Sequence, residues 1–203
     1  MTLIDEWSAS PPRAVIFDLD GTLTEPLLDF TAIRRELGIA PGHPILEALD
    51  NVDAGRRAWA ESILRRRELE AIEAATLADG CREILARLAG HGVLVAILTR
   101  NVRAAVQLFS ERFGFRFDAV FTREDGPPKP APDGVRALCA ALGVAPADAL
   151  VVGDYTFDIL AGHAGGCRAV LVRAEPVLDL EEWGSPDAVV PSLRSLLSLW
   201  PSP

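Results

Sequence analysis

Two aspartates, Asp18 and Asp20, follow directly after a short apolar run in this chain of 203 residues. Charge beside such a run costs free energy unless a cation or hydrogen bonds compensate it. A carboxylate fixed at the end of a strand can attack phosphorus and form an acyl-phosphate, and a second carboxylate can then donate and accept protons. We therefore interpret Asp18 as a candidate nucleophile and Asp20 as a candidate general acid and base. Their side chains would point to the same side if the backbone stays extended, before Gly21 permits a turn that a local Thr22 hydrogen bond could fix.

Three later apolar runs are each followed by residues that suit the same chemistry: Thr99, Lys129, and the pair Asp154 and Asp158. Ligands gather at the carboxyl ends of the strands in parallel sheets, so we expect these residues to meet Asp18 in one site. The ammonium of Lys129, which lies between prolines that limit its backbone, would offset the acidic cluster and stabilise phosphoryl oxygens. The hydroxyl of Thr99 and the amide of the residue after it, near a predicted helix start, would bind phosphate.

The aspartates also predict a metal site. A cluster of carboxylates repels a phosphate dianion, so a cation is needed between them. Asp18 and Asp154 supply hard oxygen ligands of the kind that Mg²⁺ prefers. Asp158 comes four residues after Asp154 and lies on the same face if a helix begins there, where it would hold a metal-bound water or orient Lys129.

The elements that must position these residues alternate between strand and helix. Short apolar, β-prone runs predict buried strands, and apolar residues recurring every three or four positions predict helices. The predicted strands cover residues 14–17, 93–98, 119–122, 149–153 and 169–173, and the predicted helices cover 81–92, 101–114, 132–144, 157–166 and 192–200. Asn101 is predicted to cap the second of these helices. This alternation predicts an α/β fold, with an open parallel sheet and helices on both faces.

Residues 24–79 interrupt that alternation and contain no strand signal. Apolar residues at helical spacing, including Trp59, Ile63 and Ile72, predict two or three helices. The charge-rich stretch 65–73 predicts a solvated helix face with Glu–Arg pairs. We interpret the segment as a small helical insertion, and the four tryptophans of the chain as packing residues or anchors for the C-terminal tail.

Taken together, the motifs resemble the haloacid dehalogenase-like superfamily of phosphohydrolases. They occur in the family's order and span residues 13–172: DLDGT with Asp18 and Asp20, LTRN with Thr99, PPKP with Lys129, and GDYTFD with Asp154 and Asp158. The resemblance implies a three-layer Rossmann-like core formed by residues 1–23 and 80–203, with residues 24–79 inserted as a helical cap after the first strand.

The resemblance also implies a set of binding residues. It implies Mg²⁺ held by Asp18, by the backbone carbonyl of Asp20, by Asp154, and by Asp158 directly or through a water. It implies a catalytic and phosphate-binding set made of Thr99, Arg100, Asn101 and Lys129. The cap residue that we expect to face the substrate is His43, in the loop at residues 40–46.

The position of the cap resembles the subgroup that contains phosphoglycolate phosphatases, β-phosphoglucomutases and phosphonatases. Caps of this kind close over the site, exclude water and select the leaving group. The expected function is a Mg²⁺-dependent phosphomonoesterase acting through an aspartyl-phosphate on a small phosphorylated metabolite such as phosphoglycolate. The insertion is short, however, and begins LTEP where many relatives have an Asp-Ser pair, which leaves the substrate open.

Three alternatives differ in activity. A phosphomutase would need a cap that keeps water from the intermediate, a property that a sequence alone does not reveal. A haloacid dehalogenase would not need the acid and base at Asp20. A non-catalytic phosphate- or metal-binding regulator would share the fold. Two local patterns suggest other functions but fit them poorly. DLDG departs from the spacing of a calcium-binding loop. PPKP fits the P-x-x-P pattern of a peptide ligand, but it lies between core elements.

Composition excludes several classes of protein. A net charge of −9 and a pI near 4.8 argue against nucleic-acid binding. The three cysteines form no C-x-x-C pair, which favours reduced, buried thiols. Asp5 and Glu6 precede any apolar run, unlike a signal peptide, and no apolar run has the length of a membrane span. We therefore expect a cytoplasmic protein whose partner is a small phosphorylated metabolite, without nucleic-acid or membrane partners. The oligomeric state is not predicted.

Overall fold

The computed structural model describes residue 7 and residues 10–201, so Asp5 and Glu6, used above for the signal-peptide prediction, lie outside the described residues. At its centre is a six-stranded sheet in the order β3-β2-β1-β4-β5-β6, and every neighbouring pair is parallel. The strands are β1 (Ala14–Phe17), β2 (Leu94–Leu98), β3 (Ala119–Phe121), β4 (Ala149–Gly153), β5 (Arg168–Val172) and β6 (Ala188–Val190). The predicted α/β Rossmann-like fold is confirmed.

Strand β1 lies in the middle of the sheet and is buried along its whole length. Phe17, its last residue, pairs with Ile97 of β2 and Val152 of β4. The pairing continues one residue further, because the Asp18 amide donates to the Val152 carbonyl at 3.0 Å. The backbone of the candidate nucleophile is therefore fixed by the sheet.

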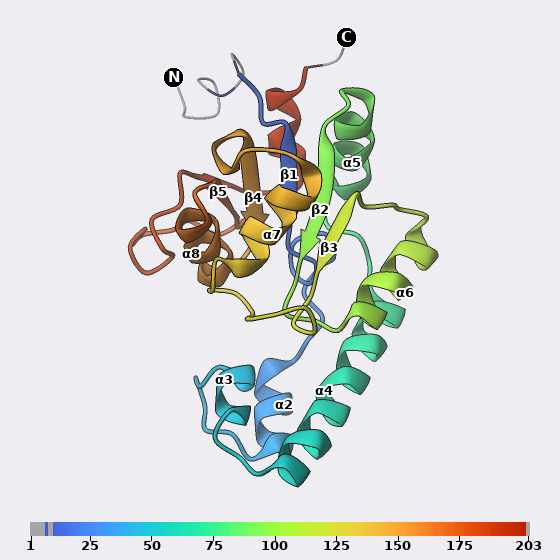
Figure 1. The fold of residues 1–203 in the computed structure, drawn as a ribbon, viewed down its shortest axis with the longest axis vertical. Coiled ribbons are helices and arrows are strands. Elements are labelled where there is room, and N and C mark those ends of the chain that lie inside the picture. The colour runs from blue at the N-terminus through green and yellow to red at the C-terminus, as the bar shows by residue number, and fades with distance from the viewer. Residues whose placement is uncertain (1–6, 8–9, 202–203) are drawn as a thin grey trace.

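Helices cover both faces of the sheet (Figure 1). Helices α5 (Cys81–Gly90) and α6 (Arg103–Phe113) and the 3₁₀ helix η2 (Leu193–Leu199) pack on one face, against Val15 and Phe17. Helices α7 (Asp133–Leu142) and α8 (Thr156–Gly165) pack on the other, against Ala14 and Ile16. The alternation of side chains along β1 thus divides the core into two apolar clusters. A short 3₁₀ helix, η1 (Pro146–Asp148), precedes β4.

Three local features differ from the sequence prediction. Strand β6 was not predicted, since three residues are too few to show a strand period. The C-terminal segment forms a 3₁₀ helix, in which the buried Leu193, Leu196 and Leu199 recur every three residues, the period of that helix. Helix α6 begins at Arg103 with Val102 as its N-cap, so Asn101 is not the cap.

Residues 24–79 contain three helices, α2 (Phe30–Leu37), α3 (Ile45–Leu49) and α4 (Ala54–Ala74). They share an apolar cluster of their own, separate from the two clusters of the sheet, which includes Ile33, Ile45 and Leu64. Figure 1 shows these helices as a lobe beyond the carboxyl ends of the strands. The lobe therefore lies over the edge of the sheet at which ligands are expected.

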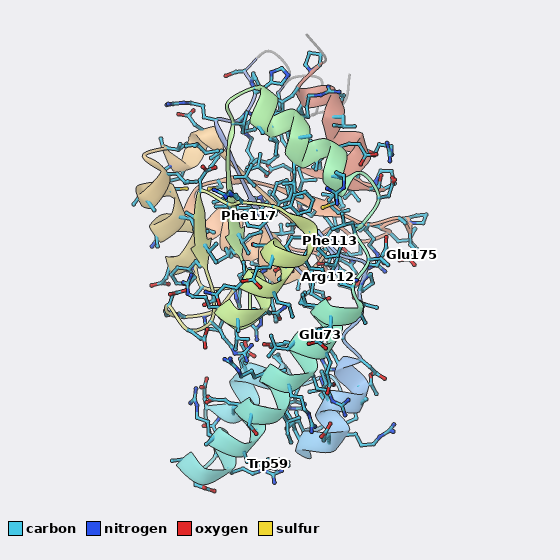
Figure 2. All side chains as sticks on the ribbon, turned by 90° about the vertical axis from the view of Figure 1, so that its right-hand side faces the viewer. Trp59, Glu73, Arg112, Phe113, Phe117 and Glu175 are labelled. Atoms are coloured by element: carbon cyan, nitrogen blue, oxygen red, sulfur yellow. The ribbon has the colours of Figure 1, made fainter. Side chains whose placement is uncertain are left out.

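The long helix α4 joins this lobe to the rest of the molecule. The guanidinium of Arg112 in α6 donates to the carbonyls of Ile72 at 2.8 Å and Ala75 at 2.5 Å, where α4 ends (Figure 2). Trp59 is at the far end of α4, 41% exposed and covered by the Arg56 guanidinium, so it is not the packing residue predicted. None of the helices in the described part of the chain is long and apolar enough to cross a membrane.

Candidate active site

A cavity of about 330 Å³ lies between the carboxyl ends of the strands and helices α2, α3 and α4. Its lining includes every core-motif residue predicted from the sequence: Asp18, Asp20, Thr99, Arg100, Asn101, Lys129, Asp154 and Asp158. These residues follow β1, β2, β3 and β4, which are adjacent in the sheet although distant in sequence. The topology of the sheet thus brings the four motifs together.

The ammonium of Lys129 is the cationic centre of the cluster. Its Nζ lies 2.7 Å from Asp18 Oδ1 and 2.5 Å from Asp158 Oδ1, and the residue is only 3% exposed. Burial opposes the charged form, but the ion pairs with Asp158 and Asp18 prevail and raise the pKa of Lys129. The other oxygen of Asp158 accepts from the Tyr155 amide at 3.1 Å, which fixes Asp158 in the first turn of α8.

Three carboxylates form a possible metal site. Asp18, Asp154 and Asp158 each have a carboxylate oxygen within 4.8 Å of the other two. Burial, with repulsion from Asp18 and Asp158, raises the pKa of Asp154 to about 8. Burial, with repulsion from Asp18, raises the pKa of Asp158 to about 6, although Lys129 opposes the shift. Lys129 alone does not compensate this negative charge, and the donor set of hard oxygens fits a small divalent cation.

Two glycines allow the backbone to approach the carboxylates of Asp154 and Asp158 closely. Gly21 has a φ of +84°, and a Cβ there would overlap the Asp154 carboxylate. A Cβ on Gly153, the last residue of β4, would overlap the carboxylate of Asp158. The Thr22 hydroxyl donates to Asp154 Oδ1 at 3.0 Å, so the prediction of a local Thr22 hydrogen bond is wrong. Thr22 instead joins the first motif to the fourth.

Asp20 differs from Asp18 in its surroundings. The backbone turns after Asp18, so the extended conformation that was the condition for a common direction of the two side chains is not present, and the amides of Leu23 and Thr24 donate to the Leu19 carbonyl. Asp20 nevertheless lines the same cavity. Burial, followed by repulsion from Asp18, raises the pKa of Asp20 to about 7. A carboxyl group with this pKa can both give and take a proton near neutral pH.

Thr99 and Asn101 present hydrogen-bonding groups to the cavity. Both are buried, and the Thr99 hydroxyl oxygen accepts a hydrogen bond from the backbone amide of Asn101 at 3.1 Å. The side-chain nitrogen Nδ2 of Asn101 has no hydrogen-bond partner among the described residues. A buried donor without a partner costs free energy, and Asn101 lines the cavity.

The side chain of Arg100 has a role that the sequence did not show. Its guanidinium binds both carboxylate oxygens of Glu47 in α3, at 2.7 and 2.9 Å, and donates to the Lys129 carbonyl. It also lies over the ring of Phe157, 4.8 Å from the centroid. Because Glu47 is 53 positions away, no local pattern could reveal this bridge between helical lobe and sheet.

Glu68 in α4 is a second residue that sequence reasoning missed. It is 2% exposed, forms an ion pair with Arg123, and accepts from the Val102 amide at 3.1 Å, at the start of α6. The predicted solvated face holds for Arg66 and Arg67, which pair with Glu36, but is wrong for Glu68. One signal in the sequence could have revealed this. Glu68 lies four positions after Leu64 and four before Ile72, so it shares their buried face of the helix.

The structure does not bring His43 into the cavity. The residue lies on an exposed loop, and its neighbours Gly42 and Pro44 line the cavity in its place. The His43 carbonyl accepts from the Arg34 side chain at 2.8 Å. Arg34, on α2, is itself part of the lining and was not among the predicted site residues.

Comparisons with known proteins also identify a hydrolase family. Residues 12–166 match the family described as haloacid dehalogenase-like hydrolase. An uncharacterized hydrolase of Saccharomyces cerevisiae is 33% identical over 168 residues, which cover 79% of this chain and 77% of the relative. A phosphoglycolate phosphatase of Rhodospirillum rubrum is 28% identical, with 83% and 84% covered. The crystal structure of a hydrolase from Pseudomonas syringae, 20% identical, has the same fold at a TM-score of 0.77 over 91% of this chain and 95% of that chain.

Proposed function

Because the chain belongs to the haloacid dehalogenase-like hydrolase family, in its phosphoglycolate phosphatase-like group, we propose that it is a Mg²⁺-dependent phosphomonoesterase that acts on a small phosphorylated metabolite. One observation carries the proposal. Asp18, fixed by the sheet and paired with Lys129, lines the same cavity as Asp20, whose raised pKa suits proton transfer. The name of the Rhodospirillum rubrum relative makes phosphoglycolate the first substrate to test.

The reaction has two steps in this proposal. An Asp18 carboxylate oxygen attacks phosphorus, the ester P–O bond breaks, and protonated Asp20 donates its proton to the leaving oxygen. Asp20, now ionised, takes a proton from a water molecule that attacks the aspartyl-phosphate, which releases phosphate and restores Asp18. Lys129 orients Asp18 and stabilises the charge on the phosphoryl oxygens.

Two further groups of residues complete the site. The phosphate is bound by the Thr99 hydroxyl, the Arg100 amide and the side-chain amide of Asn101, whose nitrogen has no other partner among the described residues. A metal ion would be held by Asp18, Asp154 and, directly or through water, Asp158, whose carboxylates lie together, and by the Asp20 carbonyl. When bound there, Mg²⁺ would offset the carboxylates and accept a phosphate oxygen.

Residues 24–79 act as a cap in this proposal, on a core formed by residues 1–23 and 80–203. Their separate apolar cluster holds the three helices together. Two ion pairs, Glu47–Arg100 and Glu68–Arg123, hold the lobe against the core beside the cavity. Closure would exclude water while Asp18 attacks, and the lobe would determine which leaving groups fit.

The test is hydrolysis of p-nitrophenyl phosphate, phosphoglycolate and a broad panel of phosphate esters with Mg²⁺. We expect Asp18→Asn to abolish activity while circular dichroism shows an unchanged fold. Asp133→Asn, the same change at an exposed position of α7, is the matched control and should retain activity. Failure of the folded wild-type protein to hydrolyse any ester would overturn the proposal.

A further inference from the structure

The cavity has a cationic side chain at the end formed by the helical lobe. Arg34 lies on α2, one turn after Phe30, and both residues line the cavity. The Arg34 Nε donates to the His43 carbonyl, which orients the guanidinium and leaves its two terminal nitrogens for other partners. Arg34 is thus a positioned cation on the side of the cavity opposite the strand ends.

The other cations in the lining already have acidic partners. Lys129 pairs with Asp18 and Asp158, and Arg100 pairs with Glu47. Arg34 forms no ion pair with any acidic residue of the described chain. Glu68, the acidic lining residue that the lobe itself contributes, forms an ion pair with Arg123. No acidic side chain of the described chain therefore occupies the guanidinium of Arg34, although carboxylates line the strand end of the same cavity.

The surroundings of Arg34 strengthen its attraction for an anion. Apolar side chains from the lobe, Phe30, Ile45 and Leu64, line the same cavity, and Phe157 contributes an aromatic ring from the core. Such walls reduce the effective dielectric around a charge pair, so an ion pair formed there is stronger than one on the surface. Arginine also presents two parallel N–H groups that match a carboxylate or phosphate.

We propose that Arg34 binds a second anionic group of the substrate, a carboxylate or a further phosphate carried by the leaving group. This inference rests on the proposed function, because it assigns the phosphoryl group to the strand ends and the leaving group to the lobe. The substrate then has two anionic ends, one held by Lys129 and Thr99 at the strand ends and the other by Arg34. An ester with a neutral leaving group leaves Arg34 without a partner.

The test compares matched pairs of esters that differ in one charge. Phenyl phosphate is compared with 4-carboxyphenyl phosphate, and ethyl, propyl and butyl phosphates are compared with the corresponding ω-carboxyalkyl phosphates, which vary the distance between the two anions. We expect the wild-type kcat/KM to be about 10- to 100-fold higher for the charged member of at least one pair, the effect of one charge-assisted hydrogen-bonded contact. Bisphosphate analogues distinguish a second phosphate from a carboxylate.

Variants assign this preference to one side chain. Arg34→Gln should remove the preference, measured as the ratio of kcat/KM for the charged ester to kcat/KM for the neutral ester, whereas Arg34→Lys should keep part of it. Arg35→Gln is the matched control, because it removes the same charge from the next, exposed residue of α2 and should keep the full preference.

Each other outcome overturns a different statement. Equal rates for charged and neutral esters in every pair would overturn the role of Arg34 and leave the phosphatase proposal intact. An equal loss for both esters in Arg34→Gln would show that Arg34 contacts the transferred phosphoryl group or supports the loop around His43, and would also overturn the inference. No hydrolysis of any ester would overturn the proposed function itself.

Discussion

Two carboxylates separated by one residue have different environments in this site. Asp18 is fixed by the backbone hydrogen bond to the sheet and by the ion pair with Lys129. Asp20 is buried close to the charge of Asp18, so its pKa is about 7. Environments that differ in this way separate a nucleophile from a proton donor.

The pKa of Asp20 leads to a prediction about pH. The first step uses protonated Asp20, so kcat/KM for an alkyl phosphate should fall as the pH rises through about 7. p-Nitrophenolate leaves without a proton, so the ratio of the alkyl rate to the p-nitrophenyl rate isolates Asp20 at pH values above the second phosphate pKa of both esters. We expect this ratio to fall about tenfold per pH unit above the pKa.

The variant Asp20→Asn provides the control for that pH dependence. It should lower the alkyl rate by about 10²- to 10⁴-fold, and the ratio should then be independent of pH. Because Asp20 also activates water in the second step, the variant should release p-nitrophenolate in a burst close to one equivalent of enzyme. A wild-type ratio that does not change between pH 6 and 9 would contradict the assignment.

At the scale of elements, prediction succeeded where the pattern was long or where the chemistry lay in the motif itself. Helix α7, for example, has a regular apolar period and ends at Gly143, and the structure shows it as expected. It failed where long-range contacts determine the structure. The start of α6 depends on Glu68, a residue of another helix, so the sequence around Asn101 contained no signal for it.

The ion pair of Glu68 with Arg123 should be a major stabilising contact between α4 and the core. Arg123→Met leaves a buried carboxylate that only the Val102 amide compensates, and burial already raises the pKa of Glu68. We expect a loss of about 3–5 kcal/mol in the free energy of unfolding, measured by urea denaturation. Adding Glu68→Gln to this variant should recover part of the loss, because the unpaired charge is removed.

A nearby surface pair is the comparison for that measurement. Arg103 and Asp125 are both partly exposed, so Arg103→Met should cost only about 0–1 kcal/mol. If both variants lose the same stability, the burial of Glu68 is not what makes its pair important.

At the scale of the whole molecule, the site exists because four adjacent parallel strands end at one edge of the sheet. This arrangement was predictable, since alternating strands and helices dictate it and the motif residues follow the strands. The lobe side of the cavity was not predictable in the same way. Arg34 and Glu47 come from helices whose sequences specify only amphipathic packing, and their partners depend on how those helices dock.

Collecting the carboxylates at one edge makes the stability of the whole molecule depend on pH and on metal. The pKa of Asp154 is about 8 and that of Asp158 about 6 in the folded chain, against an ordinary value of 3.8. Between pH 4 and 8 the unfolded chain therefore binds fewer protons than the folded chain, and raising the pH favours unfolding. We expect the Tm of the metal-free protein in EDTA to decrease from pH 5 to pH 8.

Mg²⁺ should reverse that decrease, because it binds the ionised carboxylates that the metal-free fold tolerates poorly. Calorimetry with and without Mg²⁺ should show a small rise in Tm at pH 5 and a larger one at pH 8, where a metal concentration of about 100 times Kd adds about 2.7 kcal/mol. Asp154→Asn removes the carboxylate with the most strongly raised pKa, so this variant should be more stable than wild type in EDTA at pH 8 and should gain little from Mg²⁺. If Mg²⁺ raised the Tm of wild type and of Asp154→Asn equally, the ion would not bind at Asp154. If Mg²⁺ raised the wild-type Tm equally at pH 5 and pH 8, its binding would not compete with protons on these carboxylates.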